Sequence, residues 1–229
     1  MGIILNQSIK NTIITYLGFG IGAINTLFLF PVILGDVYYA LTGYISSASN
    51  IIMPLLAFGM QNTLIKFYSQ YQTEEEKNGF LSFTVFVPIL FFIPISLVSL
   101  YFYQDITFFV SKKNKIVKSF ILLIPLIGLC MGYFEIFYAW ARVNMHSVFG
   151  NFIKEVGIRL LSLIALISVY YKLITIQSFL YITGGIYFFS LIIMMYYAFY
   201  LKKPVFKLYI PNNIKILLNI LFTLYFQEQ

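Results

Sequence analysis

Charged residues along this chain are gathered in groups, and long apolar stretches with few or no charges separate the groups. A transmembrane helix needs about 20 apolar residues, whereas a membrane β-strand needs only about 9–11. Backbone polar groups in lipid must be satisfied within the segment, so each stretch is expected to be a helix. The pattern therefore predicts an all-α membrane protein, a polytopic bundle of six transmembrane helices at residues 12–34, 41–62, 80–103, 116–138, 156–171 and 177–200.

The fifth stretch is the shortest, and we expect it to begin as an interfacial helix near Asn151. A further apolar run, 214–229, is too short and too polar at its end to be expected to span a bilayer. Residues 208–229 are therefore interpreted as the start of an incomplete seventh helix, after a six-helix lobe formed by residues 1–207. The first stretch is too long for a signal peptide and predicts a retained span.

Lysine and arginine outside the predicted spans favour one side of the membrane. If the connections alternate between the two sides, the side of the N-terminus holds Lys10, Lys66, Lys77, Arg142, Lys154, Lys202, Lys203 and Lys207. The opposite side holds only Lys112, Lys113, Lys115 and Lys172. Because basic residues accumulate in cytoplasmic loops, this asymmetry predicts a cytoplasmic N-terminus.

Composition supports the membrane interpretation and excludes several classes of function. Of the 229 residues, 60% are apolar and 10% are charged, against about 45–50% and 25% in soluble globular proteins. This excludes a cytosolic enzyme, a disordered chain and a nucleic-acid-binding module. The formal net charge of +7 is therefore interpreted as a topology signal, and no nucleic-acid partner is expected.

Residues that carry catalytic or metal chemistry are sparse. The chain has one cysteine, Cys130, and one histidine, His146, which excludes an internal disulfide, a thiolate metal site and a histidine cluster. Its only aspartates are Asp36 and Asp105, far apart in the sequence. We expect no catalytic residue, no metal site and no cofactor.

Small and polar residues recur at helical spacing inside three predicted spans, so each set marks one face of a helix. The sets are Asn11, Thr15, Gly18, Gly22 and Asn25; Gly43, Ser47, Asn50, Pro54, Ala57 and Gln61; and Pro125, Gly128, Gly132, Glu135, Ala139 and Arg142. Such faces are typical of close helix packing in membranes, and equally of the wall of a solvated substrate cavity. Packing is favoured for the glycines, and both interpretations stay open for Asn25 and Asn50.

Three basic side chains, Lys66, Arg142 and Arg159, lie at predicted cytoplasmic span ends. They are candidates either for anchoring at the membrane surface or for contacting an anionic substrate, because the guanidinium fork matches phosphate. Glu155 and Arg159 are spaced for a helical ion pair, which could act as a gate. Glu135 shares a face with Arg142, so we expect the two to pair, with proton titration as the alternative.

Four segments, taken in order and spacing, carry a family resemblance. They are 34–41 (LGDVYYAL), 53–59 (MPLLAFG), 62–68 (NTLIKFY) and 150–159 (GNFIKEVGIR). The chain resembles the polysaccharide-exporter family of O-antigen and capsule flippases, which belongs to the wider group of MATE-type multidrug exporters and lipid II flippases. The resemblance covers nearly the whole chain. Ala40 departs from the glycine that the family pattern has after the two tyrosines.

The resemblance implies a flippase in the bacterial inner membrane that moves undecaprenyl-diphosphate-linked oligosaccharide by alternating access. Such transporters have two six-helix lobes around a central cavity, and this chain corresponds to the N-terminal MATE-like lobe. Asn25 and Asn50 would then face the cavity, and Lys66, Arg142 and Arg159 would hold the diphosphate at its cytoplasmic mouth. The expected partners are the lipid-linked substrate, membrane lipids, and a missing C-terminal lobe or a second copy of the chain.

The length of the chain leaves three explanations open: a truncated gene, a fragment, or a half-transporter that dimerises. Truncation is favoured because the apolar run that starts at residue 214 is incomplete. Two other functions stay open as alternatives, a MATE-type drug or metabolite exporter lobe and an inactive remnant or scaffold. A drug exporter would need acidic, titratable residues in its cavity, and here only Glu135 lies near one.

Overall fold

The computed structural model of this chain is described for residues 2–112 and 115–204, and within these ranges it contains helices and no β-strand. The α-helices are α1 (Gly2–Ala23), α2 (Phe30–Ala57), α3 (Met60–Phe67), α4 (Glu74–Tyr101), α5 (Tyr103–Ser111), α6 (Leu123–Val143), α7 (Ser147–Phe152), α8 (Ile158–Tyr170) and α9 (Ile176–Leu201). Two π-helical segments, η1 (Ile24–Leu29) and η4 (Ile153–Gly157), and two 3-10 segments, η2 (Tyr68–Gln70) and η3 (Lys115–Phe120), connect them. The all-α prediction is confirmed for this part of the chain, and the expected seventh helix at 208–229 lies outside it.

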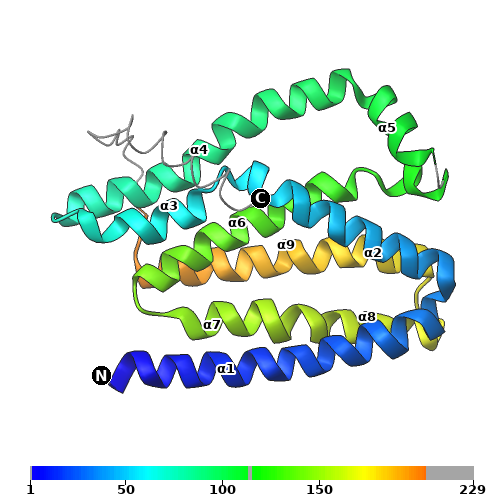
Figure 1. Ribbon diagram of the computed structural model, residues 1–229, viewed down its shortest axis with the longest axis horizontal. Coiled ribbons are helices and arrows are strands. Elements are labelled where there is room, and N and C mark those ends of the chain that lie inside the picture. The colour runs from blue at the N-terminus through cyan, green and yellow to red at the C-terminus, as the bar shows by residue number, and fades with distance from the viewer. Residues whose placement is uncertain (1, 113–114, 205–229) are drawn as a thin grey trace.

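A backbone reversal at Gly35 divides the first long apolar segment into two arms that run in opposite directions (Figure 1). Gly35 has φ 69° and ψ 166°, a conformation that is essentially restricted to glycine. The arms on either side of it correspond to the predicted spans 12–34 and 41–62. The second arm is interrupted after Ala57, where Phe58 and Gly59 adopt positive φ, and it continues as α3.

The helix that corresponds to the third predicted span begins earlier than predicted, because a polar cap starts it. The Thr73 hydroxyl accepts a hydrogen bond from the Glu76 backbone N–H, and the Glu76 carboxylate accepts one from the Thr73 N–H. This reciprocal arrangement satisfies two otherwise free donors at a helix start. As a result α4 begins at Glu74, six residues before the predicted stretch 80–103, and it ends at Tyr101.

Helix α6 is the centre of the bundle and packs against α2, α3 and α9. Its Ile136 and Trp140 side chains have no exposed surface. Gly128 and Gly132 lie against the α2 backbone, and this confirms the packing interpretation for the glycines of the third stripe. The predicted span 116–138 is misplaced toward the N-terminus, because the 3-10 segment η3 occupies residues 115–120 and α6 runs from 123 to 143.

The fifth predicted span, 156–171, is part of a longer composite helix formed by α7, η4 and α8 in succession. This composite helix begins at Ser147, beside the expected interfacial start at Asn151, and ends at Tyr170. Lys154, Glu155 and Arg159 all lie in it, so charged side chains occur near its middle. The sixth predicted span, 177–200, agrees with α9 to within one residue at each end.

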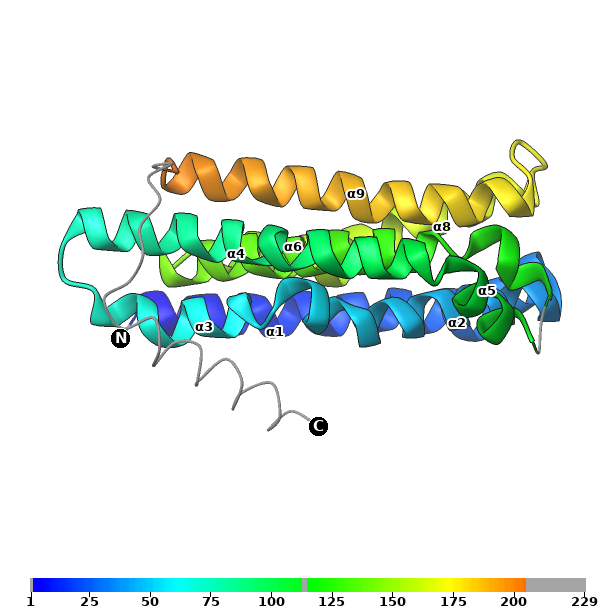
Figure 2. The ribbon, with the colours of Figure 1, turned by 90° about the horizontal axis from the view of Figure 1, so that it is seen from above.

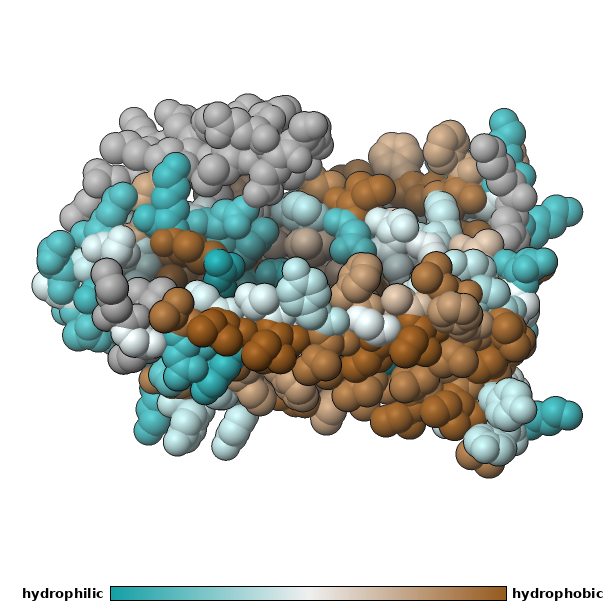
Figure 3. Space-filling model, turned by 60° about the horizontal axis from the view of Figure 1, so that its bottom comes forward, coloured by the Kyte–Doolittle hydropathy of each residue, from teal (hydrophilic) through white to brown (hydrophobic). Residues whose placement is uncertain are grey.

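Four helical segments within the described residues are long and apolar enough to cross a membrane: Leu5–Ala57, Glu74–Tyr101, Leu123–Val143 and Ile176–Leu201. Many large apolar side chains on the outside of α1, η1, α4 and α9 are exposed, among them Leu17, Phe28 and Leu90. Figure 3 shows a broad hydrophobic band across one face of the molecule, with hydrophilic residues gathered toward its two ends. The structure is therefore compatible with a membrane protein, while the six-span topology stays a prediction.

The connections alternate between the two ends of the bundle. One end holds the start of α1 and the α3–α4 and α6–α7 connections, and the other holds the Gly35 reversal, α5 and the α8–α9 connection (Figures 1 and 2). The first of these ends also contains an ion pair between Lys202 and Glu74, whose Nζ and Oε2 atoms are 2.8 Å apart. We call the end that holds the start of α1 the α1-start end, and the candidate site lies there.

Candidate functional site

The first polar stripe packs against the composite helix over most of its length. Asn11 Nδ2 donates to Ser147 Oγ at 2.9 Å, and Asn151 Nδ2 donates to the Asn11 carbonyl at 3.1 Å. Farther along α1, the Nδ2 atom of the buried Asn25 donates to the Arg159 carbonyl at 2.9 Å. The stripe therefore joins α1 to α7, η4 and α8, and Asn25 belongs to helix packing.

Glycine is required where the two helices approach most closely. A Cβ atom built on Gly18 would lie 2.7 Å from Arg159 Nη1 and closer still to the Glu155 carbonyl oxygen. One built on Gly22 would lie 2.9 Å from Arg159 Nε. At Gly18 the obstructing atoms include the Glu155 backbone, so this position leaves no room for a side chain, whereas at Gly22 they all belong to the Arg159 side chain.

The predicted pair of Glu155 and Arg159 is confirmed, with Arg159 Nη1 donating to Glu155 Oε2 at 2.8 Å. The same nitrogen donates to the Glu155 backbone carbonyl at 2.9 Å. This carbonyl lies in the π-helical segment η4, and wide turns of this kind occur frequently at functional sites. Arg159 is thus held by its own helix and by the α1 glycines.

A pocket of about 470 Å³ opens beside this contact, at the α1-start end. We call it the end pocket. Its lining comes from α1 (Gln7, Ser8, Asn11), from α6 and the following turn (Tyr138, Arg142, Met145), and from the composite helix (Ser147, Asn151, Lys154, Glu155). Apart from Tyr138 and Met145, the other eight of these ten residues carry polar or charged side chains. It is a polar space within a bundle whose outside is largely apolar.

Arg142 is the cation of the end pocket that has no acidic partner within residues 2–112 and 115–204. Its guanidinium carbon lies 5.5 Å from the ring centre of Tyr138, one turn earlier on α6. Among the described residues, no carboxylate lies within ion-pair distance of it. The side chain is exposed, so its guanidinium group is available to an incoming anion.

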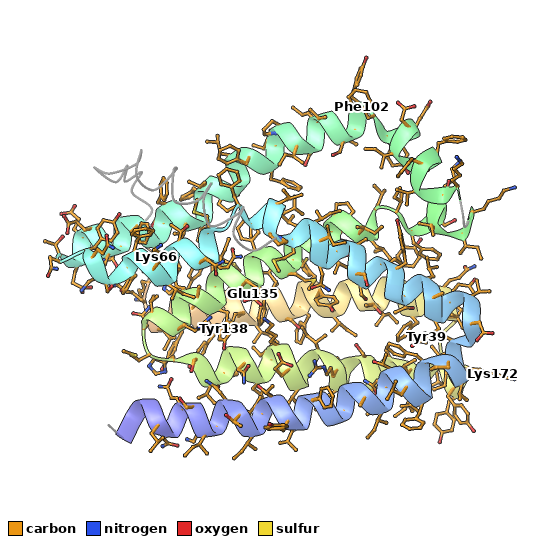
Figure 4. The ribbon with its side chains drawn as sticks, viewed as in Figure 1. Tyr39, Lys66, Phe102, Glu135, Tyr138 and Lys172 are labelled. Carbon is orange, nitrogen blue, oxygen red and sulfur yellow. The ribbon has the colours of Figure 1, made fainter. Side chains whose placement is uncertain are left out.

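The expected pair of Glu135 and Arg142 is wrong, because Glu135 Oε1 accepts a hydrogen bond from Lys154 Nζ on the composite helix. The Glu135 side chain is 18% exposed and that of Lys154 is 45% exposed. Figure 4 shows Glu135 and Tyr138 along α6, with Lys66 on the neighbouring helix α3. The pair therefore links α6 to η4 beside the end pocket.

The remaining two predicted site residues lie outside the pocket. Asn50 is exposed on α2, and its Nδ2 atom donates to the Ser46 carbonyl of the same helix. Gly43 and Ser47 are exposed on α2 as well, so the structure leaves this part of the second stripe uncovered. Lys66, in the last turn of α3, is exposed and lies over the ring of Phe67 at 5.7 Å.

Sequence reasoning missed Lys154, Ser147 and Asn151 as members of the site. A signal was present, because Ser147, Asn151, Glu155 and Arg159 follow one another at steps of four and so form a polar stripe of their own. This stripe of the composite helix is the surface that receives the first one.

Among residues 2–112 and 115–204, no group of three His, Cys, Asp or Glu side chains gathers in a way that could hold a metal ion. In comparisons with protein-family models, curated proteins and solved structures, nothing matches this chain.

Proposed function

We propose that this chain is one lobe of a membrane flippase for undecaprenyl-diphosphate-linked oligosaccharide. The observation that carries the proposal is Arg142, an exposed arginine with no acidic partner among the described residues, in a polar pocket at one end of an apolar helical bundle. Arginine binds phosphate through paired, charge-assisted hydrogen bonds. A lipid-linked diphosphate combines an anion with a long apolar tail, and so it matches a polar pocket beside a lipid-facing surface.

The family resemblance supplies the rest of the proposal. It includes six spans, a cytoplasmic N-terminus, a location in the bacterial inner membrane and transport by alternating access. The exposed part of the second stripe, with Gly43, Ser47 and Asn50, is the surface proposed to face the central cavity. The other wall of this cavity would come from a second lobe or from a second copy of the chain.

The three basic residues named from the sequence have different roles in the proposal. Arg142 is proposed to hold the diphosphate, because its guanidinium group is available. Arg159 is proposed as a positioning residue, because Glu155 and the α1 glycines already hold it. Lys66 lies on α3 outside the end pocket, so it is not assigned to the anion contact.

Reconstitution into liposomes tests this function. The full chain is incorporated with a fluorescent polyprenyl-diphosphate-linked sugar, and transfer between leaflets is followed by quenching of the outer leaflet. We expect transfer above that of protein-free liposomes, reduced at least about tenfold by Arg142→Gln, since charge-assisted hydrogen bonds contribute about 1.5–3 kcal/mol. The matched control is Lys10→Gln, an exposed cation of α1 at the same end that does not line the pocket.

Two outcomes would overturn the proposal. Transport of an organic cation without transport of the lipid-linked sugar would favour a MATE-type exporter lobe. Transport of neither substrate, by a chain that is folded and monodisperse in detergent, would favour an inactive remnant.

A further inference from the structure

We propose that the end pocket binds a phosphate or diphosphate group by exchange of an ion pair, in which Lys154 leaves Glu135 and joins Arg142 on the bound anion. This inference deepens the proposed function, on which it rests for the identity of the lipid carrier. It assigns Lys154 as a binding residue and Glu135 as the group that competes with the anion for it.

Arg142 provides the first contact, which is present before any anion arrives. Arg142 lines the pocket, and its guanidinium carbon lies 5.5 Å from the ring centre of Tyr138. A guanidinium group offers two parallel N–H donors that match two oxygens of a phosphate. No competing carboxylate among the described residues has to be displaced from it.

Lys154 provides the second contact. Its side chain lines the pocket, whereas its partner Glu135 comes from α6 and does not line it. Lys154 therefore contributes to the pocket wall while its ammonium group is paired with a carboxylate that does not. Lysine carries a point charge on a flexible four-carbon stem, so a change of rotamer suffices to move the charge from one partner to the other.

The other charges around the pocket permit this exchange. Glu155 lines the pocket, and its repulsion of an anion is offset by Arg159 at 2.8 Å. Counting the five charged groups, three cations (Arg142, Lys154, Arg159) and two carboxylates (Glu135, Glu155) leave a net charge of +1. The volume of about 470 Å³ falls within the range of about 300–1,000 Å³ that is usual for small-ligand pockets.

A binding experiment on the full chain in lipid nanodiscs tests the exchange, with inorganic diphosphate and a short-chain polyprenyl diphosphate as probes. Arg142→Gln is expected to weaken binding of both probes at least about tenfold. Glu135→Gln is expected to tighten binding about twofold to fivefold, because the anion no longer competes for Lys154. Lys154→Gln is expected to weaken binding about fivefold or more.

The double variant Glu135→Gln/Lys154→Gln gives the sharpest result. It removes the carboxylate that Lys154→Gln alone would leave without its partner, so it also controls for a folding defect. If the exchange operates, the double variant binds like Lys154→Gln and the gain from Glu135→Gln disappears. Tighter binding in the double variant than in Lys154→Gln would overturn the exchange. Weaker binding in Glu135→Gln than in the original chain would overturn it as well. Unchanged binding in Arg142→Gln would overturn the site.

The two probes distinguish the source of the anion, and the liposome assay keeps the two proposals separable. Tighter binding of the polyprenyl diphosphate supports a lipid-borne group, whereas equal binding of both probes supports a site for the soluble anion. Transfer of lipid-linked sugar that is unaffected by Lys154→Gln would contradict the exchange and leave the flippase proposal standing. Binding with the expected pattern but without any transfer would contradict the flippase proposal alone.

Discussion

Two glycines on one turn of α1 predict opposite effects of the same substitution. An added Cβ on Gly18 would lie 2.7 Å from Arg159 Nη1 and would also meet the Glu155 backbone oxygen, whereas one on Gly20 would meet nothing within 4 Å. Replacing glycine with alanine inside a helix gains about 0.8–1 kcal/mol from helix propensity. Overpacking of a close contact costs about 1–3 kcal/mol. Gly20→Ala should therefore stabilise the protein. Gly18→Ala should leave the free energy of unfolding unchanged or lower it by up to about 2 kcal/mol.

The difference between the two variants isolates the overpacking cost, because the helix-propensity gain is common to both. At about 2–4 °C per kcal/mol for a protein of this size, Gly18→Ala should melt about 2–12 °C below Gly20→Ala. Thermal unfolding of the purified protein in detergent, followed by fluorescence-detected size exclusion, measures this difference. If Gly18→Ala melts at or above the temperature of Gly20→Ala, the close contact between α1 and η4 is not present and the site must be redrawn.

Three further predictions concern other parts of the bundle. Trp140→Ala should lower the free energy of unfolding by about 3–5 kcal/mol, because this side chain has no exposed surface, and a thermal melt in detergent measures the loss. Ser49→Ala should cost about 0.5–1.5 kcal/mol in the same melt, because the buried Ser49 hydroxyl donates to the Ile124 carbonyl at 3.0 Å; no change would show that water or another group satisfies this carbonyl. The hydrogen bond and charge of Lys202 lower the pKa of the Glu74 carboxyl. The stabilisation by this pair should therefore be present above the ordinary pKa of Glu74 and be lost as the pH falls through its lowered pKa. Melting temperatures between pH 7 and pH 3 should show a smaller acid-side decrease in Lys202→Met than in the original chain.

The apolar stretches predicted the helices well, and their ends less well. The sixth stretch coincides with α9 because polar residues bound it closely on both sides. The third helix starts earlier than its stretch because the Thr73–Glu76 cap, and not hydropathy, decides where it begins. The fourth was misplaced because residues 116–120 were counted with the apolar stretch that follows them, although they belong to the 3-10 segment η3.

The site was predicted in part for a related reason. Helical spacing identifies a face, so it placed Asn11 and Gly18 together, but it does not say which helix receives that face. The expected pair of Glu135 and Arg142 failed because seven residues separate them, which is about 10.5 Å along a helix. Lys154 on the neighbouring helix is nearer, and a partner of this kind becomes visible only when the helices are packed.

The contact between α1 and the composite helix also has a consequence for how the protein is made. The hydrogen bonds that join them link residues 134 to 140 positions apart in the chain. At a synthesis rate of about 5–20 residues per second, α1 emerges roughly 7–28 s before its partner exists. During this interval the amide side chains of Asn11 and Asn25 have no partner helix, and a polar group without a partner is costly in lipid. The first helix is therefore expected to stay beside the insertion machinery, or close to its water-filled passage, until residues 147–159 arrive.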